Sequence, residues 1–516
     1  MDIRHWFVAQ APISGGILAA KLLAALVATW LGAAAGCSSS DPASKADEVV
    51  DTPDGWRNAP LEAKPLEGWC TDFDAPELEE LVELAFDQNL ELHAAWARLE
   101  QSRAIARQQG ASLWPWLSGS ASATRQKIDF GSRFGDAFSP DQVPPGGEDQ
   151  AADTSTTTTF DTYQASVAAS YELDLWGRIR SQRDAAQLDA LATRAQAESL
   201  AMTLTSQIAE NWLEMVYQRE RIALIEEQVE TSERFYELTL LRLRQGESTA
   251  LDVTQQRQNL ESLRGQVALA RGSEETARNQ LAVLVGRSPA AEVELDRQRL
   301  PELAPVPDPG VPADLVGRRP DVRAAFLRIG AADERVEAAV AERLPQIQLS
   351  ADLSVQANEI ANLFEQLLWS VSASLSQPIF QGGRITAQID QAEAVARESV
   401  FNYAQTLLTA MREVQDALIL EDRQREFTES LAKQVDSAQS ALELARDRYR
   451  LGAFDYLRVL DAIGALQQAE QSLLDARRQR LSTRVRLCRA LGGSWTRQLD
   501  QPAPEEQPVE QPVEQP

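Results

Sequence analysis

The sequence predicts a mixed fold, in which a duplicated strand-helix unit combines long α-helices with membrane β-strands. Three observations support this prediction. Segments 178–245 and 384–451 contain no residue that breaks a helix, paired segments with alternating polarity follow Pro115 and Pro345, and the second half repeats the first. A long match of this kind indicates one elongated unit that is present twice.

The clearest copies of the repeat are RLRQGESTALDV and RYRLGAFDYLRV, which contain Gly246 and Gly452. Both glycines are suited to the left-handed conformation that ends a helix, and the arginines before them suit the negative end of the helix macrodipole. Thr249 and Asp455 are good N-caps for a following helix. We therefore expect two sharp reversals, each between a long helix and a shorter one.

The spacing of the two copies defines the extent of the repeat. Gly246 and Gly452 are 206 residues apart (452 − 246), whereas Pro115 and Pro345 are 230 apart (345 − 115). The first half therefore carries 24 additional residues (230 − 206) between Leu117 and Gly177. A stretch rich in Gly, Pro, Asp and Thr accounts for them and indicates a long polar loop.

The first 36 residues indicate a targeting segment, with positive charge, an apolar run at 22–36 and small residues before Cys37. The run is too short for a membrane helix, which needs about 20 residues. Ala-Ala-Gly-Cys at 34–37 resembles the lipobox of bacterial lipoproteins, with Ala34 in place of the usual Leu. By this resemblance Cys37 is acylated, and Ser38 after it implies export to the outer membrane. The alternative is an ordinary secretory signal that leaves Cys37 as an incidental thiol.

Helical periodicity over 77–113 predicts two helices that Asn89 separates. After each of the two prolines the period changes to two, which predicts a pair of strands in each half. Each strand has about the length that crosses a membrane, and a soluble sandwich is the alternative. Aromatic residues at the strand ends favour the membrane reading, as the two girdles of a barrel, although ordinary core positions would also hold aromatics: Trp114, Trp116, Trp176, Phe380, Tyr163 and Trp369.

The predicted domains follow in order: signal peptide 1–36, anchored leader 37–76, first repeat 77–286, Pro-rich connector 287–319, second repeat 320–495 and disordered tail 496–516. The first repeat contains strands at about 116–128 and 162–175, long helix 178–245, tip turn 246–250 and helix 251–285. The second contains strands at about 346–356 and 368–379, long helix 384–451, tip turn 452–456 and helix 457–491.

Composition limits the partners. The net charge is −27 at pH 7, which argues against nucleic acid or an anionic lipid surface as the main partner. With two histidines and no zinc pair, nucleophile elbow or phosphate loop, we expect no enzyme, no metal and no cofactor besides the lipid on Cys37. Cys70 and Cys488 either form one disulfide or remain two unpaired thiols.

The ordered set of motifs resembles the outer-membrane efflux proteins of the TolC type, in particular the OprM and NodT-like lipoprotein branch that serves RND pumps. Beside the lipobox and the two turns, the motifs are YELDLWGR, GRRPDVRAA, SQPIFQGGR and ALGGSW, which begin at 171, 317, 376 and 490. The resemblance implies a homotrimer in the outer membrane. Each protomer would give four strands to a 12-stranded barrel that continues as an α-helical tunnel through the periplasm.

The resemblance also implies a function. The trimer would be a passive exit duct for small molecules that an inner-membrane RND transporter and a periplasmic adaptor deliver. Two alternatives remain: the outer-membrane duct of a type I protein secretion system, and a coiled-coil envelope lipoprotein that does not conduct. The substrates, the pump and the adaptor stay unnamed.

The site residues carried over by the resemblance lie at the turns. Arg244, Gly246, Arg450 and Gly452 are candidates for adaptor docking, although they are also plain helix-reversal signals. Asp461 matches a family position whose carboxylates ring the closed tunnel entrance, with a solvated helix face as the alternative. Arg458 stands where the family often has a second acid, and Asp252 occupies the equivalent place in the first half. We therefore expect an Asp252–Arg458 link between neighbouring tips, and a preference for cations.

Overall fold

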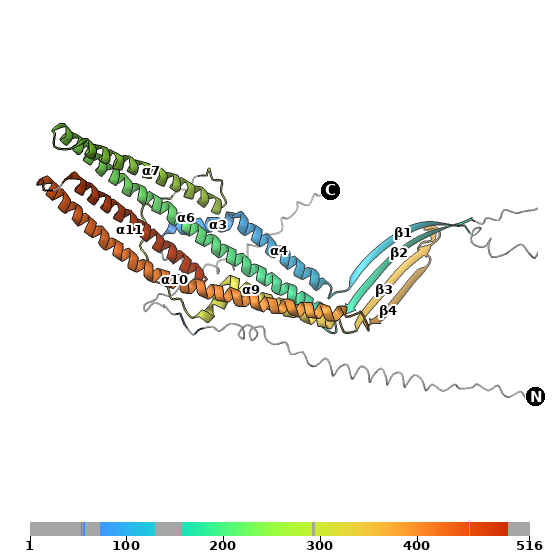
Figure 1. Cartoon of the computed structure of the whole chain (residues 1–516). Coiled ribbons are helices and arrows are strands. Elements are labelled where there is room, and N and C mark those ends of the chain that lie inside the picture. Colours follow the sequence, from blue (N-terminus) through green and yellow to red (C-terminus); the bar gives the residue numbers. More distant parts are fainter. Residues whose placement is uncertain are drawn as a thin grey trace, which may run out of the picture.

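The structure, a computed structural model, describes residues 73–129, 157–291, 295–453 and 455–493, together with residues 53, 55 and 56. Within them the molecule is elongated, with helices along most of its length and a sheet at one end (Figure 1). The predicted signal peptide, Cys37, Cys70 and the predicted tail lie outside the described residues.

The chain begins with two helices, α3 (Pro76–Gln88) and α4 (Leu90–Ala111). As predicted, Asn89 separates them. Its side chain accepts a hydrogen bond from the Leu92 amide at 2.9 Å, which caps α4, and donates to the Leu284 carbonyl at 2.8 Å. One side chain thus starts a helix and ties it to the end of another element.

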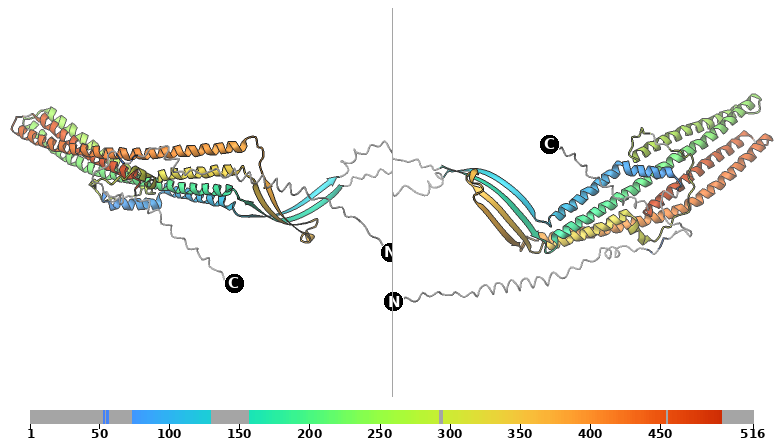
Figure 2. Two further views of the ribbon diagram at one scale, coloured as in Figure 1. Left: turned by 90° about the horizontal axis from the view of Figure 1, so that it is seen from below. Right: turned by 180° about the vertical axis from the view of Figure 1, so that it is seen from behind.

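Four antiparallel strands form one sheet in the order β1 (Trp116–Asp129), β2 (Thr157–Leu173), β3 (Gln346–Ala357) and β4 (Leu367–Ser376). A short 3-10 turn, η4 (Ile360–Asn362), lies between β3 and β4. The sheet curves away from the helices, as two further views show (Figure 2).

Two strand boundaries differ from the prediction by three residues or more. β2 begins five residues before 162, because residues 157–160 continue the pairing with the outer end of β1. β4 ends at Ser376, three residues before 379, because Pro378 has no amide hydrogen to donate to a neighbouring strand. The 24 additional residues therefore lengthen β1 and β2 as well as the segment that joins them.

The long helices are α6 (Arg178–Arg244) and α10 (Arg384–Arg450), each one residue shorter than predicted because Gln245 and Leu451 cap them. Each spans on the order of 100 Å at 1.5 Å per residue. The chain then reverses into α7 (Ala250–Leu284) and α11 (Tyr456–Ala490). The two reversals lie at the same end of the molecule, opposite the sheet (Figures 1 and 2).

The connector between the halves includes η3 (Pro312–Asp314) and leads through α8 (Leu315–Arg318) into α9 (Pro320–Ala341). It is fastened by Arg484 of α11, which is fully buried and donates to the Ala304 carbonyl at 2.8 Å. The same guanidinium lies 2.7 Å from the buried carboxylate of Glu421 in α10. A buried ion pair therefore joins both helices of the second hairpin to the connector.

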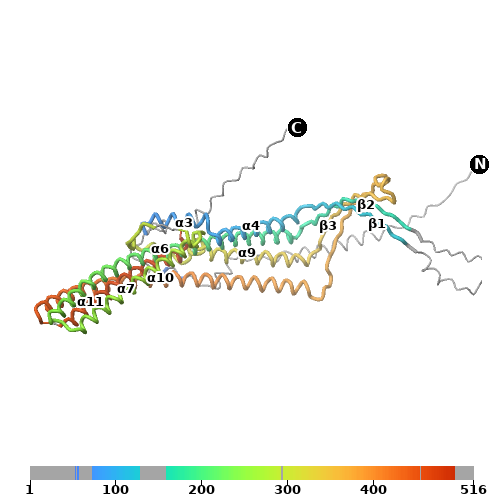
Figure 3. Tube along the Cα trace, turned by 90° about the horizontal axis from the view of Figure 1, so that it is seen from above, coloured from blue at the N-terminus to red at the C-terminus, as the bar shows by residue number. Residues whose placement is uncertain are grey.

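The main core lies around the middle of α6, where α3 and the ends of α7 and α11 pack against it. Trp212 is fully buried at its centre, with the Arg297 guanidinium 5.9 Å from the ring centroid. In the half of the molecule nearer the sheet, α4 runs beside α6, and α9 runs beside both α6 and α10 (Figure 3). A smaller buried cluster near the second tip lies within α10 and α11, and Phe235 of α6 packs against it.

None of the helices in the described ranges has a segment both long and apolar enough to cross a bilayer. Cys488 is buried in α11. The alternatives of a disulfide with Cys70 and of two unpaired thiols stay untested, since Cys70 lies outside the described ranges.

Candidate functional site

One face of the sheet carries mostly polar residues. The register places Ser120 beside Ser166 and Ser350 beside Ser372, and their hydroxyl oxygens lie 2.8 and 2.7 Å apart. Gln348 donates to the Ser170 hydroxyl at 3.0 Å. Cross-strand rows of serine and glutamine therefore form a continuous surface that water can hydrate.

The opposite face is apolar. One register row joins Leu117, Ala169, Ala351 and Val371, and the next joins Gly119, Val167, Leu353 and Trp369. Leu117, Val371 and Trp369 are 72 to 75% exposed. A sheet with one hydrated face and one bare apolar face needs an apolar environment on that side.

The aromatic residues lie at the two levels predicted for them. Trp114 and Phe380 are 74 and 88% exposed at the junction with the helices, and Trp369 lies towards the other end of β4. Tyr163 belongs to the apolar face, whereas the register puts Trp116 on the serine face beside Ser170. Trp116 therefore lies on the polar face of the sheet, whereas Tyr163 and Trp369 lie on the apolar face. Their role at a membrane interface stays a prediction.

Trp176 ties the two strand-helix junctions together. Its indole N–H donates to the Pro345 carbonyl at 2.8 Å, across 169 residues of sequence. Next to it, Gly177 has a φ of 80°, and Asp174 accepts from the amides of Ile179 and Arg180 at the start of α6. Along the chain, the YELDLWGR segment therefore ends a strand, makes a tight turn and caps the start of the next helix.

The two tips have the same backbone geometry. Gly246 and Gly452 have φ values of 79° and 72°. The residue after each glycine donates its amide to the carbonyl five positions earlier, from Glu247 to Arg242 and from Ala453 to Arg448, both at 2.9 Å. Nothing lies within 4 Å of a β-carbon built on either glycine. Both tips are therefore open to contact from outside, and their docking role stays a prediction.

The N-caps predicted at the tips are confirmed. Thr249 accepts from the Asp252 amide at 3.2 Å, and the Asp252 carboxylate accepts from the Thr249 amide at 2.8 Å and from the Ser248 hydroxyl at 2.9 Å. Asp455 accepts from the Arg458 amide at 3.2 Å. Partial burial opposes ionisation of Asp252, but these hydrogen bonds outweigh it and hold its pKa below the ordinary value.

The three gate candidates are not brought together within one chain. The Asp252 carboxylate is engaged in its own turn, while Arg458 and Asp461 are exposed on α11. Within the described residues of one chain, Asp252 and Arg458 do not form an ion pair. The expected link joins neighbouring copies, so it stays a prediction.

The structure adds contacts between the hairpins that the sequence pattern did not indicate. The Arg242 guanidinium lies 4.5 Å from the Tyr449 ring centroid, and that of Arg446 lies 5.1 Å from the Phe235 ring centroid. Tyr456 donates to Gln256 at 2.8 Å, and burial raises the pKa of its phenol to about 12. The sequence pattern indicates Arg242 only as a cation at the end of a helix.

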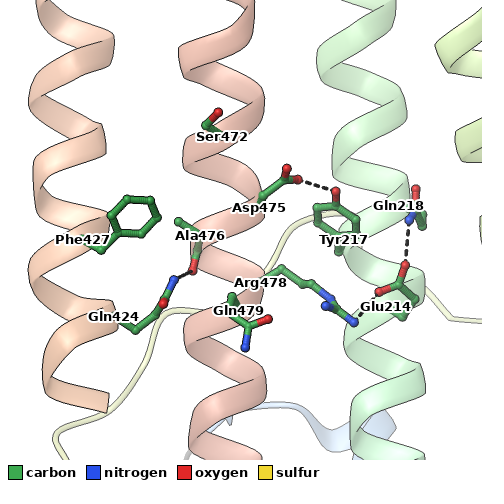
Figure 4. Close-up of a pocket in the computed structure, with 10 residues that line it drawn as sticks. All are labelled: Glu214, Tyr217, Gln218, Gln424, Phe427, Ser472, Asp475, Ala476, Arg478 and Gln479. Carbon is green, nitrogen blue, oxygen red and sulfur yellow. Dashed lines mark hydrogen bonds and ion pairs between the residues drawn. The ribbon is translucent and has the colours of Figure 1, made fainter. Parts of the chain in front are cut away.

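A pocket of about 790 Å³ lies between α6, α10 and α11 (Figure 4). Tyr217 donates to Asp475 at 2.5 Å, and Arg478 lies 2.8 Å from the Glu214 carboxylate. Burial and the hydrogen bond to Asp475 both raise the pKa of Tyr217. Arg478 and Glu214 form an ion pair and the Asp475 carboxylate accepts from Tyr217, so these side chains join neighbouring helices across the pocket. In the described part of the chain, no group of three or more potential metal ligands gathers.

A family model described as "Outer membrane efflux protein" matches residues 81–287 and 311–493. The chain belongs to the outer membrane efflux protein family. This is a family of channels and not a class of enzymes, so the protein is an outer-membrane efflux channel. Its strands and long helices are the parts from which such a channel is built.

Two curated relatives cover most of the chain. The pyoverdine export outer membrane protein OpmQ of Pseudomonas putida is 30% identical over 476 residues, which is 90% of this chain and 96% of that protein. Outer membrane protein OprJ of Pseudomonas aeruginosa is 32% identical over 431 residues, 83% of this chain and 86% of OprJ.

Solved channels share the fold. The outer-membrane channel OprN superposes with a TM-score of 0.75 at 27% identity, covering 87% of this chain and 98% of OprN. CusC superposes with a TM-score of 0.71 at 27% identity, covering 86% of this chain and 99% of CusC. Family, fold class, outer-membrane location and efflux function are thereby confirmed as predicted.

Proposed function

We propose that this efflux protein works as a homotrimer, in which three copies close one duct across the outer membrane and the periplasm. The observation that carries the proposal is the open sheet, whose edge strands β1 and β4 each lack a partner on one side among the residues that the structure describes. Open edges cannot remain in lipid, because no water is there to satisfy their amides and carbonyls. Pairing β4 of one copy with β1 of the next removes every edge.

The two sheet faces support the same assembly. In a closed barrel the rows of serine and glutamine would line the interior, and the rows that contain Val371 and Trp369 would contact lipid. The long helices beneath the sheet would continue the interior as a tunnel on the order of 100 Å long. Movement through such a duct needs no energy from the duct itself.

The tips are the proposed meeting point with an adaptor that links the duct to an inner-membrane RND transporter. Gly246 and Gly452 leave open space around the reversals, and Arg244 and Arg450 are exposed next to them. The Arg450 side chain is 78% exposed, and its contact with Asp447 is long, at 3.7 Å. Substituting these arginines should weaken adaptor binding without altering trimer formation.

The cargo is proposed to be small molecules. Relatives bear names that specify pyoverdine export and toluene efflux, and these names describe those proteins. We assign this chain no reaction and no cofactor beyond a covalent lipid on Cys37.

Conductance of the purified full chain in planar bilayers tests the proposal. Trimer-sized particles that conduct ions are expected, and a protein that inserts as a trimer without conducting would refute the duct. Asp461→Ala and Arg458→Ala test the gate: we expect each to change conductance or cation preference. If neither variant does so, the gate assignment fails while the duct stands.

A further inference from the structure

A pocket of about 440 Å³ lies where β4 ends and α10 begins. Arg343, Arg384 and Gln377 line it together with Ile379 and Phe380. These last two side chains are 95 and 88% exposed, immediately after the last residue of the membrane strand. The pocket therefore places guanidinium groups beside bare apolar side chains at the boundary between sheet and helices.

Within the described ranges, no carboxylate pairs with the two arginines of this pocket. Arg384 donates to the neutral amides of Gln381 and Gln388, the latter at 2.8 Å. The Arg343 guanidinium forms no ion pair with another described residue, and the Arg343 carbonyl accepts a hydrogen bond from Gln377 at 2.8 Å. At the other junction, by contrast, the Arg178 guanidinium lies 2.7 Å from the Glu172 carboxylate.

A neighbouring copy does not supply the missing negative charge. This step rests on the proposed trimer, in which β4 pairs with β1 of the next copy and the α4–β1 junction of that copy lies opposite the pocket. Between Glu100 and Asp129 that segment contains four basic residues and no acidic one: Arg103, Arg107, Arg125 and Lys127. Its own pocket of about 360 Å³ is lined by Arg107 and Trp114.

We propose that the seam at this junction binds the phosphate of a phospholipid from the membrane leaflet that faces the periplasm. Arg343 and Arg384 would hold the phosphate, since a guanidinium pairs with phosphate oxygens through two parallel hydrogen bonds. Ile379 and Phe380 would contact the acyl chains, as aromatic and aliphatic residues do at a membrane boundary. The ligand is thus an amphiphile that matches both halves of the pocket.

The net charge of −27 does not oppose this local site. Charges separated by more than about 8 Å are largely screened at physiological ionic strength. The acids of the long helices are distributed over about 100 Å, whereas the arginines of the junction lie within one pocket. Local charge therefore decides which headgroup binds here.

The test measures phosphatidylglycerol on the purified full-length trimer by native mass spectrometry, after detergent exchange has removed loosely bound lipid. Arg343→Gln/Arg384→Gln should weaken retention roughly tenfold or more, since each lost charge-assisted hydrogen bond weakens binding. Arg397→Gln/Arg412→Gln removes two arginines from α10 farther from the sheet and should retain lipid like the wild type. Equal retention by the wild type and both double variants would overturn the proposal.

Three further measurements sharpen the result. Arg343→Lys/Arg384→Lys keeps the charge and should retain more lipid than the glutamine variant. If the glutamine variant fails to form trimers, the wild type decides: retention must fall as salt is raised, and salt-independent retention would overturn the proposal. Inorganic phosphate should displace the lipid poorly because it lacks acyl chains, and complete displacement at equal concentration would show a phosphate site instead of a lipid site.

Trimer mass and bilayer conductance are recorded on the same samples. Conducting trimers without arginine-dependent lipid retention refute only the lipid site. Absence of trimers in the wild type refutes the proposed assembly, and the seam with it.

Discussion

Gly492 lies so close to Arg318 that a β-carbon at position 492 would come within 2.5 Å of the Arg318 carbonyl oxygen. Gly286 and Gln88 stand in the same relation, at 2.1 Å. The glycines are 206 residues apart (492 − 286) and their partners 230 (318 − 88), the two offsets of the sequence repeat. The duplication therefore preserves one close approach, in which the end of a hairpin packs against the last residue of a helix, just before the next helix begins.

The first prediction concerns this approach. Gly286→Ala and Gly492→Ala should each destabilise the protein by at least about 1–3 kcal/mol, because the φ values of 78° and 93° are strained for alanine and the new β-carbon meets a backbone oxygen. Gly265→Ala and Gly464→Ala, in the same helices with open space around them, should stabilise by about 0.5–1 kcal/mol. Denaturant unfolding measures both sets, and equal effects would contradict the argument.

The second prediction concerns the buried pair of Arg484 and Glu421, whose side chains are 1 and 5% exposed. Glu421→Gln should cost about 3–5 kcal/mol, since it leaves a buried guanidinium without its counter-charge. The combined change Arg484→Met/Glu421→Leu should recover most of that loss. The exposed pair of Arg423 and Glu426 is the control, for which Glu426→Gln should cost less than about 1 kcal/mol in the same unfolding experiment.

The third prediction is a pH dependence at Asp321. Burial opposes its ionisation, but the hydrogen bonds and charge of Arg319 outweigh burial and hold the pKa of Asp321 below its ordinary value. Its folded pKa is thus lower than its unfolded pKa of about 4, so it stabilises the fold above that pH. This contribution should be lost as the pH falls through the folded pKa. Asp321→Asn should weaken the dependence of the unfolding free energy on pH below about pH 4. An unchanged dependence would contradict this role of Asp321.

The fourth prediction concerns the contacts between hairpins. Tyr449→Ala and Phe235→Ala should each raise the open probability of the reconstituted channel roughly two- to fivefold, because each removes a cation–π contact of about 0.5–1 kcal/mol. Phe427→Ala is the control, because Phe427 is an exposed ring of α10 that makes no cation–π contact with a described arginine. It should leave gating unchanged. Single-channel recording distinguishes these outcomes. Equal behaviour of all three variants would exclude a role for these contacts.

The fifth prediction concerns Cys37. If the segment before it is a lipoprotein signal, the mature protein begins at Cys37 and carries acyl chains, which Cys37→Ser should abolish. Mass spectrometry of the mature chain measures this directly. Accumulation of precursor after globomycin treatment is the matching test on the wild type, and its absence would remove the lipid from the proposal.

Most of the local structure was predictable because it depends on near neighbours in sequence. Asn89 caps α4, Thr249 and Asp455 cap the helices after the tips, and Gly246 and Gly452 end the helices before them. Alternating polarity identified the two faces of the sheet. β4 ends three residues before its predicted end, because Pro378 has no amide hydrogen to donate to a neighbouring strand.

Contacts between distant residues could not be predicted in this way. No local signal indicates that Arg242 packs on Tyr449 or that Trp176 bonds to the carbonyl of Pro345. Each joins residues separated by more than 150 positions, so their meeting depends on how the two halves pack. The arginines at the β4–α10 junction likewise become a pocket only when strand end and helix start are placed together.

By itself the sequence determined the repeat, the lengths of the helices and the faces of the strands, because glycine, proline and the period of polarity act on the local backbone. Only the tertiary structure decided which side chains of one half meet those of the other, and which edges and charges are left without partners. Those pairings depend on packing between long rods, where a shift of one turn exchanges every contact. The unpaired edges and charges in turn define what the protein needs from its neighbours and from the membrane.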